Sequence, residues 1–240
     1  MKQKVSDYIA EYIAQWGIRD VFTVTGGGAM HMNDAFGHHK MLHCTYQHHE
    51  QACAMAAEAY ARLGNKMAAV CVTTGPGATN AITGVLGAWM DSIPMLVFSG
   101  QARYATTVSA SGLPLRSMGV QECNIVPVVK SLTKYAHMIV HPENIRYHLE
   151  KALYLAVNGR PGPVWLDIPL DVQGAVIETD DLKAYDPEEN PEQQPREIKD
   201  ETVEQILDKL QESKRPVLSP GNGVRLAGAH EDFYQLAELL

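Results

Sequence analysis

The sequence predicts an α/β fold: a doubly wound, mostly parallel sheet with helices on both faces, followed by a linker and a truncated second α/β domain. Three observations lead to this prediction. Short unbroken apolar runs, such as residues 67–72, are typical of parallel strands covered on both faces. Helical stripes alternate with these runs, as in doubly wound proteins. Composition then changes sharply near Thr179.

The alternation begins with a helix. Apolar residues from Val5 to Trp16 recur at the i, i+3, i+4 spacing of one helical face, and Gly17 is placed to end it. A strand at 20–24 and a glycine turn at 25–28 follow, and the missing side chains of the turn let another group approach the backbone. A later helix is expected to end at Gly64. The remaining predictions are helices at 29–37, 52–63, 78–90 and 143–157, and strands at 43–46, 67–72, 94–99, 135–140 and 163–168.

The same pattern suggests the domain boundaries. Residues 1–178 are predicted as one domain, and the acidic, proline-containing segment 179–196 as an exposed linker. Beyond it, residues 197–240 show a helical face and a strand at 216–219, and the sequence stops inside another amphipathic helix. A complete domain of roughly 40 residues without disulfides or a metal would be unusual. We therefore expect residues 197–240 to be the start of a domain whose remainder is absent.

Charge and composition limit the function classes. A formal net charge of -8 and a pI near 5.7 argue against broad binding to nucleic acid or to an anionic membrane, since both need clustered Lys and Arg. The N-terminus lacks the apolar core of a signal peptide, and no run of ~18 apolar residues could cross a bilayer. The cysteines form no CxxC pair, which favours free thiols in a reducing compartment and predicts a soluble cytoplasmic protein.

Glu50, at the start of an alanine-rich helix, is the main candidate for chemistry. A carboxylate surrounded by small apolar side chains is costly to keep ionised, because burial disfavours the charged form. A sequestered acid of this kind suits proton transfer better than an exposed one. The alternative is a helix-start glutamate that only binds backbone N–H groups.

A second glycine loop, at 73–80, follows the strand at 67–72. Its G-x-G-x-x-N spacing looks like a dinucleotide-binding turn but lacks the third glycine, so we do not expect NAD. The histidines between residues 38 and 49 form neither an HExxH motif nor a Cys/His set with ligand spacing, which argues against a metal site. The sequence contains no GxSxG elbow and no P-loop lysine, so hydrolase and nucleotide triphosphatase functions lack support.

The order and spacing of these motifs resemble thiamine diphosphate enzymes of the acetolactate synthase type. Residues 1–177 resemble the family's pyrimidine-binding domain, and residues from about 197 onward resemble the start of its central domain. The segments that carry the resemblance are 25–28, 48–62, 74–80, 90–94, 99–101, 121–122, 133–134, 159–163 and 167–172.

The resemblance implies roles for individual residues. Glu50 would share a proton with the N1′ atom of the cofactor's pyrimidine ring. Gly26 and Gly27 occupy a turn whose backbone meets the aminopyrimidine, although Thr25 stands where the family has proline. The residues implied to wall the pyrimidine pocket from the second loop are Thr74, Gly75, Gly77 and Asn80.

Two further residues are implied on the substrate side. Gln121 aligns with the glutamine of a Phe-Gln-Glu motif, and Lys134 with a lysine near the substrate entrance. Surface or structural roles are the equal alternative for both. Val120 replaces the phenylalanine of the motif, which leaves acetolactate synthesis open and also fits enzymes that act on other 2-oxo acids.

The resemblance implies thiamine diphosphate as the cofactor and a 2-oxo acid as the substrate of decarboxylation, carboligation or both. The family holds Mg2+ and the diphosphate with a Gly-Asp-Gly run in a third domain, and this sequence contains no such run. The cofactor lies between two chains, which implies a homodimer or higher homo-oligomer; whether FAD is bound stays open. We expect these 240 residues alone neither to bind the cofactor firmly nor to turn over. The alternative is a noncatalytic pyrimidine-domain module for dimer assembly or regulation.

Overall fold

The computed structural model describes residues 1–193 and 197–239 of the chain. Contacts divide the chain into two units, Met1–Gln193 and Gln194–Leu240. The strands are β1 Lys2–Lys4, β2 Asp20–Thr23, β3 His43–Tyr46, β4 Ala69–Val72, β5 Met95–Gln101, β6 Tyr135–Met138, β7 Pro163–Pro169 and β8 Val176–Glu178. Short 3-10 turns apart, the helices are α1 Val5–Trp16, α2 Met30–His38, α3 Glu50–Gly64, α4 Pro76–Asn80, α5 Ile82–Met90, α6 Val108–Ser111, α7 Ile125–Val129, α8 Ile145–Val157, α9 Leu170–Gly174, α10 Asp200–Glu212, α11 Asn222–Leu226 and α12 His230–Leu239.

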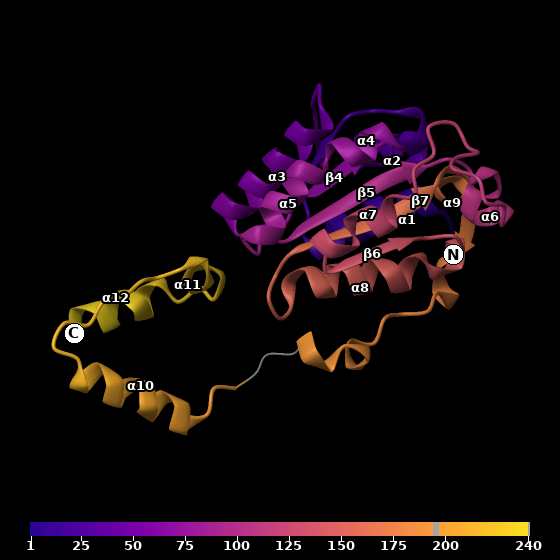
Figure 1. The fold of residues 1–240 in the computed structure, drawn as a ribbon. Helices are drawn as coiled ribbons and strands as arrows, with labels where there is room; N and C mark the ends of the chain where they lie inside the picture. Colours follow the sequence, from indigo (N-terminus) through magenta and orange to yellow (C-terminus); the bar gives the residue numbers. More distant parts are fainter. Residues whose placement is uncertain (194–196, 240) are drawn as a thin grey trace. The chain divides into compact units, whose positions relative to one another are not determined.

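The first unit is built on a six-stranded parallel sheet in the order β3-β2-β4-β5-β7-β6 (Figure 1). The pairing runs from Asp20 opposite His43 at one end to Met138 opposite Asp167 at the other. Every strand expected between residues 20 and 168 is present, with bounds that differ from the prediction by two residues or fewer. The predicted doubly wound α/β fold is therefore confirmed.

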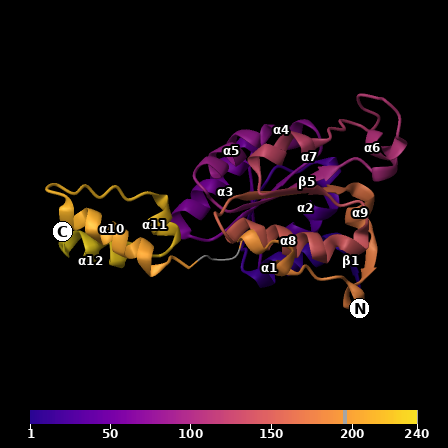
Figure 2. The same ribbon diagram turned by 60° about the horizontal axis from the view of Figure 1, so that its bottom comes forward.

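Helices cover both faces of this sheet (Figure 2). Alternate residues of β4 reach opposite cores, Ala69 and Cys71 one of them and Val70 and Val72 the other. Helices α1, α2 and α8 enclose the first core, and α3, α5 and α7 enclose the second. Burial on both faces explains why the strand sequences are continuously apolar instead of alternating.

Parallel strands bring their carboxyl ends to one edge of the sheet. The turn after β2, the loop after β4 and the ends of β5 and β7 all meet there, and α3 begins at the same edge after β3. Ligands of doubly wound sheets bind outside this edge. The fold therefore gathers most of the candidate residues, which lie far apart in the sequence.

Some local predictions differ from the structure. Helix α3 includes Gly64, and the left-handed residue that follows it is Asn65, with φ 49. The helix predicted at 78–90 starts earlier, at Pro76, and is divided into α4 and α5. Strands β1 and β8 form an antiparallel pair that places Lys2 opposite Glu178, and nothing in the local pattern predicts it.

The segment 179–193, expected as part of an exposed linker, packs partly against the first unit. Leu182 and Tyr185 are buried, and the backbone N–H of Tyr185 donates to the Glu150 carboxylate on α8 at 2.7 Å. By its contacts, this segment accordingly groups with the first unit as far as Gln193. The rest of the expected linker, 194–196, lies outside the described residues.

The second unit contains α10, α11 and α12 among its described residues. The strand predicted at 216–219 does not form, because the described part of this unit offers no strand to pair with, and Val217 is exposed. On α10, Val203, Ile206 and Leu207 are also exposed. No helix of the described chain is both long and apolar enough to span a bilayer.

Candidate functional site

The first glycine loop lies directly against the second. The backbone N–H of Gly28 donates to the Thr73 hydroxyl at 3.0 Å, and a Cβ atom added to Gly26 would lie 2.4 Å from the Cβ of Thr73. A Cβ on Gly27, in contrast, would meet no atom within 4 Å. Gly26 is therefore required for packing between the loops, whereas the space beside Gly27 is open.

Two residues beneath the first loop fix its backbone. A Cβ atom on Gly100, in β5, would lie 2.1 Å from the carbonyl oxygen of Gly28, so this position needs glycine. The buried amide of Gln173, on α9, donates to the same carbonyl at 2.7 Å. The sequence prediction did not include Gln173, and a polar residue after an apolar strand gives no specific signal.

Glu50 is the first residue of α3, and the ring of His49 caps the helix by accepting from the N–H of Gln51 at 3.1 Å. The Glu50 carboxylate accepts a hydrogen bond from the side chain of Asn80 at 2.9 Å. Its other oxygen lies 3.3 Å from where a Cβ of residue 77 would stand, so Gly77 makes room for it. The structure thus brings Glu50, Gly77 and Asn80 together, as expected.

The Glu50 side chain is less enclosed than expected. Glu50 is half-buried, and Asn80 is exposed. The small residues of α3, such as Cys53, Ala54 and Ala57, face the second core, whereas Glu50 stands at the open edge where the helix begins. Within one chain, the carboxylate therefore keeps a side that the described residues do not cover.

Thr74 and Gly75 lie in the second loop but face inward. The Thr74 hydroxyl donates to the side-chain oxygen of Gln101 at 2.7 Å, so it does not line the open edge. Gly75 has φ +59, and a Cβ atom there would lie 2.0 Å from the carbonyl oxygen of Gln121. Gln121 is itself exposed and left-handed, with φ 55. The second loop and the Gln121 loop are therefore in direct contact.

Lys134 is not part of this cluster. It precedes β6, and its backbone N–H donates to the carbonyl of Pro163 at the start of β7, which is the amino edge of the sheet. Within a single chain, Lys134 therefore lies at the opposite edge of the parallel sheet from the glycine loops.

The Lys134 ammonium group donates to the Asn158 carbonyl, and burial lowers the pKa of Lys134 to about 8. The side chain lines a cavity of about 370 Å³ together with Trp89, Arg160 and Glu192.

A buried polar network lies behind the glycine loops, and the sequence prediction did not include it. Asp167, fully enclosed in β7, accepts from the Ser99 hydroxyl at 2.6 Å and from the Gln101 amide at 3.1 Å. The Ser99 oxygen also accepts from the indole N–H of Trp165 at 2.8 Å. Burial raises the pKa of Asp167 to about 7, against the lowering effect of these hydrogen bonds. An aspartate inside an apolar strand was the available sequence signal.

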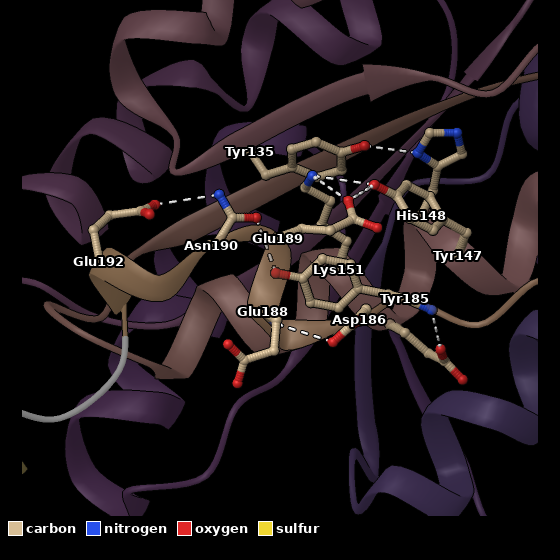
Figure 3. Close-up of polar contacts among 11 residues, drawn as sticks. Tyr135, Tyr147, His148, Lys151, Tyr185, Asp186, Glu188, Glu189, Asn190 and Glu192 are labelled. Carbon is tan, nitrogen blue, oxygen red and sulfur yellow. Dashed lines mark hydrogen bonds and ion pairs between the residues drawn. The ribbon is translucent and has the colours of Figure 1, made fainter.

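A second polar cluster, drawn in Figure 3, holds the 179–193 segment on α8. The Lys151 ammonium lies 5.3 to 5.7 Å from the ring centres of Tyr135, Tyr147 and Tyr185, and 3.6 Å from the Glu189 carboxylate. The Tyr135 hydroxyl contacts the His148 ring at 2.6 Å. Burial lowers the pKa of His148 to about 4, so the ring is neutral near pH 7. This cluster serves to attach the 179–193 segment to α8, and it lies apart from the glycine loops both in the sequence and in the sheet.

Among the described residues, no three His, Cys, Asp or Glu side chains are placed to hold a metal ion. The chemical groups at the carboxyl edge include the Glu50 carboxylate with its Asn80 amide partner, and a first glycine loop with open space at Gly27.

Comparisons with known proteins agree with this arrangement. The chain is 34% identical over 244 residues to "Acetolactate synthase 2, chloroplastic" of Zea mays, covering 99% of the chain and 36% of the relative. It is 34% identical over 224 residues to the chloroplastic acetolactate synthase of Arabidopsis thaliana, with 92% and 32% coverage. It is 33% identical over 234 residues to the acetolactate synthase large subunit of Lactococcus lactis, with 97% and 39% coverage. The chain thus spans about a third of the length of these curated relatives.

A family model agrees with these matches. The model described as "Thiamine pyrophosphate enzyme, N-terminal TPP binding domain" matches residues 3–122, half of the 240 residues. The matched region contains both glycine loops, Glu50 and Gln121. The chain therefore belongs to the thiamine pyrophosphate enzymes, as their N-terminal TPP-binding domain.

Proposed function

We propose that this chain is the pyrimidine-binding part of a thiamine diphosphate-dependent enzyme that acts on a 2-oxo acid by decarboxylation, carboligation or both. The observation that carries the proposal is the Glu50 carboxylate, held by Asn80 beside two interlocked glycine loops. Relatives named acetolactate synthases, aligned over nearly the whole chain, support the reaction class.

The residues at this edge fit an aminopyrimidine ring. Gly27 leaves open space above its backbone, which a flat ring can approach without meeting a side chain. Asn80 holds one carboxylate oxygen of Glu50, and the missing side chain of Gly77 frees the space beside the other. When bound, thiamine diphosphate supplies a carbon nucleophile and an electron sink, which protein side chains lack.

Glu50 would exchange a proton with the ring nitrogen of the pyrimidine. Its position at the start of α3 fixes the direction of the carboxyl group, and the bond from Asn80 restricts its rotation. A proton donor of this kind must lie within hydrogen-bond reach of the atom that it serves. Gly26 and Gly27 would set how deeply the ring can enter. Gly26 packs closely on Thr73, and Gly27 presents bare backbone with open space beside it.

The site needs partners outside this chain. We propose that the diphosphate and Mg2+ are held by a part of the enzyme beyond these residues, since the chain spans about a third of its relatives. We also propose that a second copy closes the site, which the half-exposed state of Glu50 supports.

The test uses the enzyme that carries this chain, with and without Glu50→Gln. Glutamine keeps the shape of the side chain and its contact with Asn80 but cannot transfer a proton, so we expect carbon dioxide release from pyruvate to fall by about 10² or more. Glu143→Gln is the matched control, because Glu143 also lies in the first turn of a helical segment but is 67% exposed and far from the loops in the sequence.

Two results would point elsewhere. Turnover that persists unchanged in Glu50→Gln would remove the proton-transfer role. If the wild-type assembly binds a second copy but neither binds thiamine diphosphate nor turns over, the chain is a noncatalytic module for assembly or regulation.

A further inference from the structure

Gln101 connects three segments behind the site. Its side chain is 1% exposed at the carboxyl end of β5. The amide nitrogen donates to the Asp167 carboxylate at 3.1 Å and to the backbone carbonyl of Cys123 at 2.8 Å. The amide oxygen accepts from the Thr74 hydroxyl at 2.7 Å and from the N–H of Ala102 at 3.0 Å. The Gln101 side chain makes all four of these hydrogen bonds at the same time.

These contacts specify the orientation of the amide group. Both neighbours of the nitrogen, Asp167 and the Cys123 carbonyl, are acceptors, and both neighbours of the oxygen are donors. A rotated amide would place donor against donor and acceptor against acceptor. Asp167 thus anchors Gln101 in a single orientation, and Gln101 in turn fixes the Cys123 carbonyl.

The Cys123 carbonyl belongs to the loop that carries Gln121. Gln121 has φ 55, a left-handed backbone conformation that is uncommon outside Gly, Asn and Asp and that persists where the surrounding structure holds it. The carbonyl oxygen of Gln121 packs against Gly75, where any Cβ atom would collide with this oxygen. Two supports therefore hold this loop: the glycine contact from one side and the Gln101 amide from the other.

We infer that Gln101 is a positioning residue, which holds the Gln121 loop and the second glycine loop in register with each other beside Glu50. The role of the positioned loop on the substrate side rests on the proposed function. The positioning itself does not, and it can be measured without any turnover.

The first experiment uses cysteine thiols as reporters. Cys53 and Cys71 are buried, and Cys44 and Cys123 are half-buried. In a Cys44→Ser background, Cys123 is the one partly accessible thiol, so its rate of alkylation by a maleimide reports on the Gln121 loop. Mass spectrometry of the labelled peptides separates local opening from global unfolding, because unfolding would also label Cys53 and Cys71.

Gln101→Leu keeps a side chain of similar volume but loses all four hydrogen bonds. We expect it to speed Cys123 labelling about tenfold or more while Cys53 and Cys71 stay protected. Asp167→Asn is the conservative variant, since its amide oxygen can still accept from Gln101 while its NH2 group donates to Ser99. It should stay within about threefold of the wild-type rate. Unchanged labelling in Gln101→Leu would overturn the inference, and so would labelling of all three thiols together.

The second experiment measures the consequence in the enzyme that carries the chain. Gln101→Leu should raise the KM for pyruvate by about tenfold and change kcat less, because substrate placement is lost before chemistry. Asp167→Asn should keep the wild-type KM. Equal KM values in wild type and Gln101→Leu would contradict the link to substrate, even if the thiol result stands. If the wild type has no activity at all, the proposed function fails while the labelling result is unaffected.

Discussion

Burial determines how the Asp167 carboxyl group titrates. Its pKa is raised from 3.8 to about 7 because the group is fully enclosed in β7. The folded state therefore holds its proton between about pH 4 and pH 7, where the unfolded chain has released it. The free energy of unfolding should fall as pH rises through this window.

Asp167→Asn should remove that dependence. Between pH 5 and pH 8, we expect the wild type to lose on the order of 2 to 3 kcal/mol more stability than the variant does. Urea unfolding at both pH values, followed by the fluorescence of the tryptophans, measures the difference. Identical pH slopes in the two proteins would show that the carboxyl group is already ionised at pH 5.

Two adjacent glycines should respond differently to the same substitution. Gly26→Ala places a methyl group 2.4 Å from Thr73, so it should destabilise the fold by about 1 to 3 kcal/mol. Gly27→Ala meets nothing within 4 Å, so its melting temperature should stay unchanged while thiamine diphosphate binding weakens. Thermal unfolding and calorimetric titration of the assembled enzyme test the pair. Cofactor affinity that is unaffected in Gly27→Ala would place the ring elsewhere.

The candidate site was predictable only where the sequence encodes local chemistry. Glu50 and the glycines of both loops stand out because helix starts and turns have residue preferences, and the structure brings them together. Thr74 faces inward because its hydroxyl donates to Gln101, which lies 27 residues further along the chain. No local sequence pattern encodes this contact. Lys134 directly precedes β6 and so lies at the amino edge of the sheet, and its role on the substrate side stays a prediction.

At the scale of elements, periodicity predicted the helices and strands well where burial is regular. Helix α1 has the predicted bounds, since one apolar stripe and a left-handed Gly17 define it. The C-terminal end of α3 was harder to predict, because Asn as well as Gly adopts the left-handed conformation. In the structure, Asn65 is the left-handed residue that follows the helix. The β1–β8 pair joins residues at opposite ends of the first unit, so it depends on the fold itself.

The contact between α3 and α5 offers a matched test of helix packing. A methyl group on Gly84 would lie 2.6 Å from the Cβ of Ala54 and 2.7 Å from α3 backbone atoms, whereas one on Gly87 meets nothing within 4 Å. Both substitutions raise helix propensity equally. We expect Gly84→Ala to lower the free energy of unfolding by about 1 to 3 kcal/mol and Gly87→Ala to leave it unchanged or raise it slightly. Chemical denaturation of both variants decides, and equal stabilities would mean that the helices can move apart at no cost.

The 179–193 segment should detach from α8 when Lys151 is replaced by an uncharged residue. Lys151 lies among three tyrosine rings and beside Glu189, so Lys151→Met removes both the cation–π and the ionic contacts. Lys183 is an exposed lysine within the segment, next to the buried Leu182, and a protease needs a locally opened backbone, so trypsin cleavage there reports on opening of the segment. We expect cleavage after Lys183 to become about tenfold faster. The control is Lys130→Met, at an exposed lysine, and equal cleavage rates in the two variants would remove Lys151 from the anchor.

At the scale of the whole molecule, the exposed apolar side chains of α3 and α5 support the proposed pairing of two copies. Met55 is 47% exposed and Met90 is 66% exposed, and both line one surface groove between these helices. Leu86 and Trp89 are also exposed on α5. Apolar side chains gathered on neighbouring helices are typical of a surface that a partner covers.

Met90→Lys should therefore weaken self-association. A charge placed in an apolar interface stays unpaired on burial, so we expect the dissociation constant of the dimer to rise by about tenfold to a hundredfold. Val176→Lys is the control, because Val176 is 65% exposed but lies on β8, in the separate two-stranded sheet. Sedimentation equilibrium over a range of concentrations measures both variants against the wild type. A wild-type chain that stays at its monomer mass of 26.4 kDa at high micromolar concentration would show that α3 and α5 do not pair two copies of this chain by themselves.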